Sequence, residues 1–274
     1  MIRSLTIAAV VAVVAAPAFA QPGAADWRTP DPENVLVIDT NKGRIIAELS
    51  PEAAPNHATR VRELARAGFY DGRSFFRVIN EFMAQTGDPK DDGTGGSEKD
   101  DLVGEFTWRR GADSMFSTVA KPAGAELGFI GTMPAMSQTT ALAAMTADRK
   151  VSAWGMFCPG VLGMARGDNP DSANSQFFLM RQAYPSLDKR YTAFGRVLSG
   201  LEAVRSIKTG EPVPAPQDVM QKVRVLADIP AKERPSVRVV DTRSAWFKAE
   251  ADRVKATRGA DFSPCDVDIP VEVK

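Results

Sequence analysis

The sequence predicts a mainly β domain, built as an antiparallel barrel or sandwich. Short β-branched runs outnumber the segments with helical periodicity. The connections are short and carry turn residues, for which the chain's 21 Gly and 19 Pro residues are suited. Parallel strands would need a long helical crossover between one strand and the next, so antiparallel pairing is favoured.

A targeting segment is expected before this domain. Arg3 is followed by an apolar run that ends in the small-x-small sequence 18–20, directly before Gln21-Pro22. This order is typical of a secretory signal peptide cleaved near Ala20. The run is shorter than the ~20 apolar residues that a membrane-spanning helix needs. We therefore expect a periplasmic or secreted protein, with no membrane insertion after residues 1–20 are removed.

The first half of the domain has clear local signals. Residues 21–34 are polar and Pro-rich and are expected to form a linker. The runs 35–40 and 44–49 predict a β-hairpin whose turn uses Gly43. Residues 55–67 have amphipathic helical spacing, and Gly68 follows as a C-terminal cap. Residues 74–79 predict a strand.

The loop at 88–101 is rich in Gly and Asp, but it matches no ligand motif. Lys90 and Lys99 stand where a calcium loop needs oxygen ligands, and the loop lacks the Gly-Lys-Ser/Thr ending of a phosphate-binding loop. A flexible connection is expected there.

The second half combines predicted strands with two segments whose residues follow no single helix or strand pattern. Strands are predicted at 191–198 and 222–229, with a short helix at 201–208. Residues 105–157 have mixed character, with short strands and a helical turn among the options. Residues 230–274 form a charged C-terminal extension in which a helix is expected at 243–257.

Composition excludes several classes of function. The 34 basic and 34 acidic residues balance, which argues against nucleic acid as a partner. The one histidine, His57, leaves no His-rich metal site, and it is expected to face solvent near the start of the first helix. No cofactor or metal is expected.

Both cysteines, Cys158 and Cys265, follow the expected cleavage site. Disulfides persist in the compartments that exported proteins reach. A bridge would tie the C-terminal extension to the domain, whereas two unpaired thiols remain the alternative, because the sequence does not give their distance.

An ordered series of motifs resembles the cyclophilins, the peptidyl-prolyl cis-trans isomerases. The series begins at 75–79, continues through 82–88 and the glycine loop 93–96, and ends with 163–166, 175–178, 187–188 and 194–197. The resemblance implies a closed eight-stranded antiparallel β-barrel capped by two α-helices, over residues 35–229. Residues 105–157 interrupt the match as an insertion, either an extra lobe over the groove, a partner surface or a loop decoration.

The resemblance also implies the roles of individual residues. Arg77 corresponds to the catalytic cation, although a structural cation packed on neighbouring phenylalanines is the alternative. The residues that correspond to substrate-binding positions are Ile79, Phe82, Met83, Gln85, Ala165, Arg166, Gln176, Phe178, Leu187 and Tyr191.

These roles imply an enzyme that rotates X-Pro peptide bonds and assists the folding of exported proteins. Its partners would be proline-containing segments of unfolded or exported chains, and we expect a monomer. A non-catalytic chaperone or partner-binding module with the same fold is the alternative function.

Three positions depart from the family pattern. Ser186 stands where many members have tryptophan, Tyr191 where they have histidine, and Arg166 where they have asparagine. In better-known members that indole helps to bind cyclosporin, so tight binding of the drug is not expected. Altered substrate specificity is expected rather than loss of activity.

Overall fold

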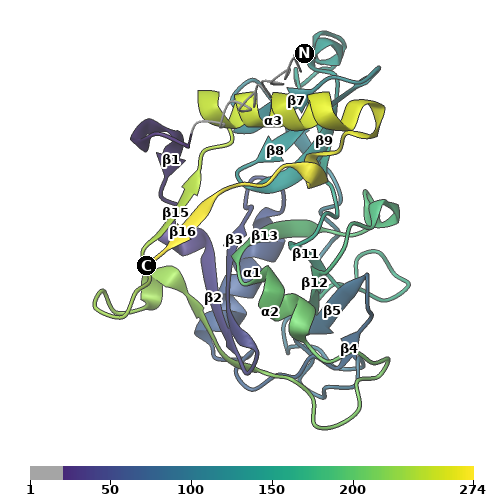
Figure 1. The fold of residues 1–274 in the computed structure, drawn as a ribbon. Helices are drawn as coiled ribbons and strands as arrows, with labels where there is room; N and C mark the ends of the chain where they lie inside the picture. The colour runs from purple at the N-terminus through teal and green to yellow at the C-terminus, as the bar shows by residue number, and fades with distance from the viewer. Residues whose placement is uncertain (1–20) are drawn as a thin grey trace, which may run out of the picture.

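The computed structural model describes residues 21–274, so the expected signal peptide lies outside the described residues. An eight-stranded antiparallel sheet forms the main body (Figure 1). Its strands run in the order β14-β2-β3-β13-β11-β12-β5-β4. Their bounds are β2 (Val35–Thr40), β3 (Gly43–Leu49), β4 (Arg77–Val78), β5 (Met83–Thr86), β11 (Val161–Met164), β12 (Phe177–Met180), β13 (Ala193–Ser199) and β14 (Met220–Val225).

The expected closed barrel is wrong, because the sheet is an open half-barrel. β14 and β4 are the two edges, and no continuous ladder joins them within residues 21–274. Near the two edges the chain is joined by isolated bridges, such as Ser74 with Val219 and Val78 with Gly210, and by single backbone hydrogen bonds, such as that from Phe75 N–H to the Asp218 carbonyl. β4 is only two residues long, so it offers too few backbone groups to complete a ladder.

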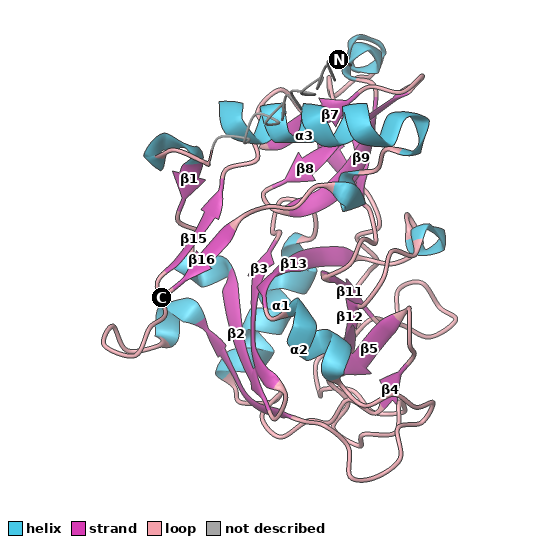
Figure 2. Ribbon diagram, in the orientation of Figure 1, coloured by secondary structure: helices cyan, strands magenta, loops and turns pink. Residues whose placement is uncertain are grey.

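Two helices cover this sheet, as expected. α1 (Pro55–Arg66) and α2 (Leu201–Ser206) lie against it in Figure 2. α1 buries Val61 and Leu64 in a core that also contains Phe75, Phe177 and Phe194. The hairpin forms as predicted, with Gly43 at φ 126° in the turn.

The insertion folds as a second sheet. Its five strands run in the order β6-β10-β9-β8-β7, all antiparallel, and a 3₁₀ helix, η3 (Thr140–Met145), precedes β10. α3 (Ala245–Arg258), the helix expected in the extension, lies across this sheet in Figure 1. The Phe247 ring of α3 packs edge to face against the Phe129 ring of β8, with 5.2 Å between the centroids. The strand bounds are β6 (Trp108–Arg110), β7 (Phe116–Ala120), β8 (Ala125–Ile130), β9 (Met133–Gln138) and β10 (Val151–Gly155).

A third sheet joins segments from both ends of the described chain. β15 (Val237–Val240) lies between β1 (Trp27–Arg28) and β16 (Val271–Val273), in antiparallel order. The segment 21–34, expected to be a linker, thus contributes a strand. Within residues 21–274 no helix has the length and apolar character to cross a membrane.

His57 is buried, so the expectation that it faces solvent is wrong. Its side chain is 0% exposed, and Nδ1 lies 2.7 Å from Glu105 Oε2. The same carboxylate accepts hydrogen bonds from the backbone N–H groups of Asn56 and His57, at the first turn of α1. Ala54 offers no side-chain cap, so a carboxylate from the start of the insertion caps this helix and covers the imidazole.

Candidate active site

Nine of the eleven residues assigned by resemblance line one pocket of about 170 Å³. They come from β4, β5 and β12, from the residue before β5, and from the segments that follow β11 and β12, which are distant in sequence. The lining residues are Arg77, Phe82, Met83, Gln85, Ala165, Arg166, Phe178, Leu187 and Tyr191. The floor is apolar, because Met83, Phe178 and Leu187 are buried.

Arg77 reaches this pocket from the edge of the sheet. β4 pairs with β5 so that Arg77 lies opposite Gln85. Arg77 Nη1 donates to Gln85 Oε1 at 3.3 Å, and Nε donates to Glu211 Oε1 at 2.6 Å. The guanidinium is therefore held by polar partners at the rim of an apolar pocket.

Gln85 and Gln176 form a chain of hydrogen bonds that continues from Arg77. Gln85 Nε2 donates to Gln176 Oε1 at 2.9 Å. Gln176 Nε2 in turn donates to the carbonyl oxygens of Gly93 and Gly95, at 3.1 and 2.8 Å. Both glutamines also line a neighbouring groove of about 390 Å³, which shares Gln85, Ala165 and Arg166 with the pocket. The two hollows are therefore adjacent, with these three residues between them.

The glycine loop is organised around a buried carboxylate. Asp88 is 0% exposed and accepts hydrogen bonds from the backbone N–H groups of Lys90, Asp92 and Gly93. The loop that the sequence suggested to be flexible therefore has a specific internal anchor. It presents the carbonyl groups of Gly93 and Gly95 to Gln176.

Two of the predicted residues lie outside the pocket lining. Ile79 is partly buried against the cluster beneath the pocket, and its N–H donates to the Met83 carbonyl, so it braces the β4–β5 turn. Gln176 lines the adjoining groove rather than the pocket itself.

Aromatic residues that the motif comparison did not identify extend the site. Tyr184 is 43% exposed and its ring lies 4.5 Å from that of Phe82, centroid to centroid. Phe157 stacks behind Phe178 at 5.8 Å. Both come from segments outside the matched motifs, so only the tertiary packing reveals them.

Arg166 is held over aromatic rings. Its guanidinium lies 4.5 Å from the Tyr191 ring centroid and 5.9 Å from that of Phe106. Nε and Nη2 also donate to the Arg190 carbonyl. Tyr191 therefore serves as a stacking platform for the cation where two hollows meet.

The insertion packs behind the pocket and contributes no residue to its lining. Pocket residues Met83 and Phe178 belong to the same buried cluster as insertion residues Phe116, Met133 and Ala135. The insertion is thus a folded sheet rather than a simple loop, and it does not line the pocket. Its side chains pack against the buried side of the residues that form the pocket floor.

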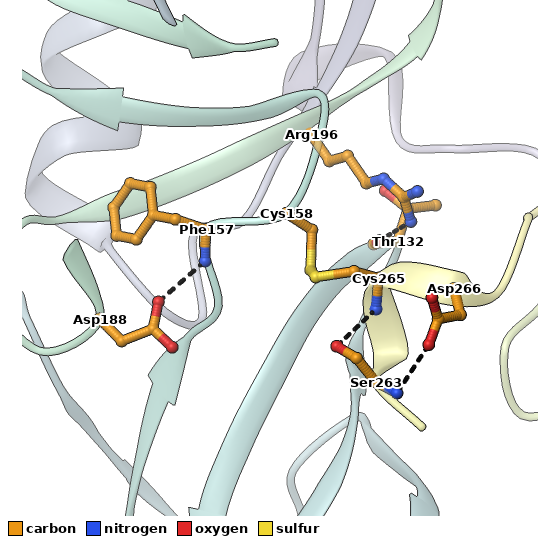
Figure 3. Close-up of a disulfide and its surroundings, with 8 residues drawn as sticks. All are labelled: Thr132, Phe157, Cys158, Asp188, Arg196, Ser263, Cys265 and Asp266. Carbon is orange, nitrogen blue, oxygen red and sulfur yellow. Dashed lines mark hydrogen bonds between the residues drawn. A yellow bond between two sulfur atoms is a disulfide. The ribbon is translucent and has the colours of Figure 1, made fainter. Parts of the chain in front are cut away.

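A disulfide joins the extension to this support. Cys158 and Cys265 are bonded, with a Cα–Cα distance of 5.2 Å (Figure 3). The residue before Cys158 is Phe157, whose N–H donates to Asp188 Oδ1 at 3.0 Å. Burial raises the pKa of the Asp188 carboxyl to about 6, although this hydrogen bond opposes the rise. Asp188 directly follows Leu187 of the pocket, so the bridge, the acid and the pocket floor are adjacent.

Residues 21–274 contain no group of three or more His, Cys, Asp and Glu side chains placed to hold a metal ion. The pocket offers one permanent cation, amide groups and apolar walls. Such a site can bind an apolar ring and direct hydrogen-bond donors at it.

Comparison with known proteins agrees with this geometry. Residues 35–227 match the family model for cyclophilin type peptidyl-prolyl cis-trans isomerases. A probable peptidyl-prolyl cis-trans isomerase of Brucella suis is 35% identical over 191 residues, which cover 66% of this chain and 74% of the relative. Peptidyl-prolyl cis-trans isomerase B of Bacillus subtilis is 32% identical over 190 residues, covering 69% and 94%.

A solved structure extends the likeness to most of the chain. The cyclophilin AquaCyp293 from Hirschia baltica superposes with a TM-score of 0.83 at 34% identity, covering 90% of this chain and 93% of that one. The match covers all but a tenth of this chain. The insertion and the extension are each longer than that tenth, so the match includes at least part of each. With the motifs in order, the pocket assembled and the family model matched over residues 35–227, this chain belongs to the cyclophilin-type peptidyl-prolyl cis-trans isomerases.

Proposed function

We propose that Arg77 is the catalytic cation of this isomerase and that its substrates are X-Pro bonds in exported proteins. The observation that carries the proposal is a guanidinium at the rim of an apolar pocket lined by Phe82, Met83, Phe178 and Leu187. Apolar walls of this kind suit a prolyl ring, and a ring bound there would have its nitrogen near the donors at the rim.

The chemistry follows from the resonance of the amide. Partial double-bond character gives the X-Pro bond a rotation barrier of about 18–20 kcal/mol. Twisting the bond ends this resonance and localises a lone pair on the prolyl nitrogen. A donor aimed at that nitrogen binds the twisted state more tightly than either planar isomer, and this difference lowers the barrier.

Arginine suits this task better than the other basic residues. Its guanidinium stays protonated and offers several N–H donors in a fixed plane. The apolar walls exclude water, which strengthens the interaction with the nitrogen lone pair. The amide groups of Gln85 and Gln176, linked at 2.9 Å, are placed to bind the peptide backbone along the adjoining groove.

Two features support exported proteins as the substrates. The sequence of residues 1–20 has the pattern of a cleavable signal, and the Cys158–Cys265 bridge is of a kind that persists in oxidising compartments. We further propose that the protein acts as a monomer in the periplasm or outside the cell, on proline-containing segments of unfolded chains.

The test is cis-to-trans exchange in a short X-Pro peptide, followed by NMR. We expect fast exchange with the wild-type protein and a loss of about 10²–10³ in rate for Arg77→Ala, the usual cost of removing a transition-state donor. Arg238→Ala is the matched control, because Arg238 is an exposed, ion-paired arginine on β15, outside the pocket lining. Equal rates for Arg77→Ala and wild type would refute the role of Arg77. Exchange at background for the folded wild-type protein would instead favour the non-catalytic binding module.

A further inference from the structure

We propose that Glu211 is a positioning residue for Arg77, and this inference rests on the proposed catalytic role of that arginine. Glu211 Oε1 accepts a hydrogen bond from Arg77 Nε at 2.6 Å, on one edge of the guanidinium. Gln85 Oε1 accepts from Nη1 at 3.3 Å. Within residues 21–274, Nη2 has no hydrogen-bond partner, so it remains available to a bound peptide.

The backbone on either side of Glu211 is fixed to β4, the strand that carries Arg77. Val78 and Gly210 exchange two N–H···O bonds, each 2.8 Å long. Val213 N–H donates to the Phe76 carbonyl, also at 2.8 Å. Gly210, directly before Glu211, is thus joined to Val78, directly after Arg77. Val213 joins the same loop to Phe76, directly before Arg77. This arrangement brings the carboxylate and the guanidinium into register independently of their own contact.

The carboxylate can act on Arg77 in two opposing ways. By holding Nε, it restricts a long side chain that would otherwise sample several rotamers, and so it keeps the donors directed at the pocket. By its charge, it weakens the positive field felt by the prolyl nitrogen. The Arg77 side chain is 36% exposed and that of Glu211 57% exposed. Because water screens such a pair, the loss of field is small, and we expect the gain in geometry to dominate.

Glu211 also lies outside every motif that identifies the family in this sequence. The motif series ends at 197, and the pocket lining does not include Glu211. Its role is visible only through its contact with the guanidinium, since the loop reaches β4 from 134 residues further along the chain.

The test measures kcat and KM separately for an X-Pro peptide with wild type, Glu211→Ala and Glu211→Gln. We expect Glu211→Ala to lower kcat/KM about two- to fivefold, mainly through kcat, the range for an exposed ion pair. Glu211→Gln should restore most of the rate, because its amide oxygen still accepts from Nε. Glu202→Ala is the matched control, as Glu202 pairs with Arg205 on α2 and is also exposed.

A second measurement reads the contact directly. The Arg77 Nε–H signal in ¹⁵N-resolved NMR should shift in Glu211→Ala and stay close to its wild-type position in Glu211→Gln and Glu202→Ala. Melting curves of all variants check that the fold is intact.

Several outcomes would overturn the proposal. Wild-type kcat in Glu211→Ala would show that the contact does not position the cation. A kcat above that of wild type would show that the main effect of Glu211 is to weaken the positive field of Arg77. Equal losses in Glu211→Ala and Glu211→Gln would show that charge, not geometry, matters. If the wild-type protein and Arg77→Ala are both inactive, the proposed function has failed, and an unchanged Nε–H signal in Glu211→Ala would separately exclude the contact.

Discussion

Asp188 gives the sharpest stability prediction, because it is an acid held behind the pocket and has no ion pair with any residue of 21–274. Its pKa is raised from 3.8 to about 6 by burial, opposed by the hydrogen bond from Phe157 N–H. Arg258, Asp261 and Asp266 line the same cavity, but Arg258 pairs with Asp266 at 3.3 Å. The folded protein therefore keeps the Asp188 proton to a higher pH than the unfolded chain does.

The sign and the size of the effect follow from this shift. Well below pH 3.8, the ordinary pKa of this group, the carboxyl is protonated in both the folded and the unfolded states and costs nothing. Between about pH 4 and pH 6 the unfolded chain loses this proton while the folded protein keeps it, so stability falls across this range and levels off above about pH 6. A shift of about two pKa units corresponds to about 3 kcal/mol, which solvent screening of a half-buried group reduces to roughly 1–2 kcal/mol.

The assay is urea unfolding of wild type and Asp188→Asn between pH 4 and pH 8. The variant cannot ionise, and its amide oxygen can still accept from Phe157 N–H. We expect the free energy of unfolding of the variant, relative to wild type, to rise by roughly 1–2 kcal/mol between pH 4 and pH 8. Asp168→Asn, at an exposed loop position, is the control and should show no such trend. A difference between Asp188→Asn and wild type that stays constant over this pH range would refute the reasoning.

Two further predictions concern the insertion and the extension. Replacing Cys158 and Cys265 by alanine opens a loop that spans 107 residues. The free energy of unfolding, measured by urea titration, should therefore fall by about 4–5 kcal/mol. A loss below about 1 kcal/mol would contradict this account. Arg110→Met leaves Glu126 buried without its ion-pair partner and should cost about 3–5 kcal/mol, whereas Arg110→Met combined with Glu126→Leu should cost clearly less in the same assay. Equal losses in the single and double variants would refute that reading.

Much of the site could be predicted because its parts are local motifs. The segments 74–79, around 165 and around 187 each carry a recognisable pattern, and the structure assembles them in one pocket. Of the strand predicted at 74–79, only Arg77–Val78 are in a strand. The hairpin and α1 were also predictable, since turn chemistry and apolar spacing act over a few residues.

What the sequence did not reveal depends on contacts between distant segments. His57 is buried because Glu105, 48 residues away, folds over the start of α1. The support of Phe178 by Phe157 depends on how the second sheet docks. The closed barrel was a wrong expectation because strand count alone does not fix whether the edge strands are long enough to pair.

The small three-stranded sheet has a consequence for the order in which the protein can fold. β1 has no partner until β15 has been made, more than 200 residues later, and β15 gains its second neighbour only when β16 follows. A chain synthesised from its N-terminus must therefore keep the backbone of Trp27–Arg28 without a β-strand partner until most of the chain has been made. The eight-stranded sheet lacks no strand once residue 225 has emerged, so it can form earlier. The native pairing of β1 can therefore form only after residues 237–240 are available, later than the last strand of the eight-stranded sheet.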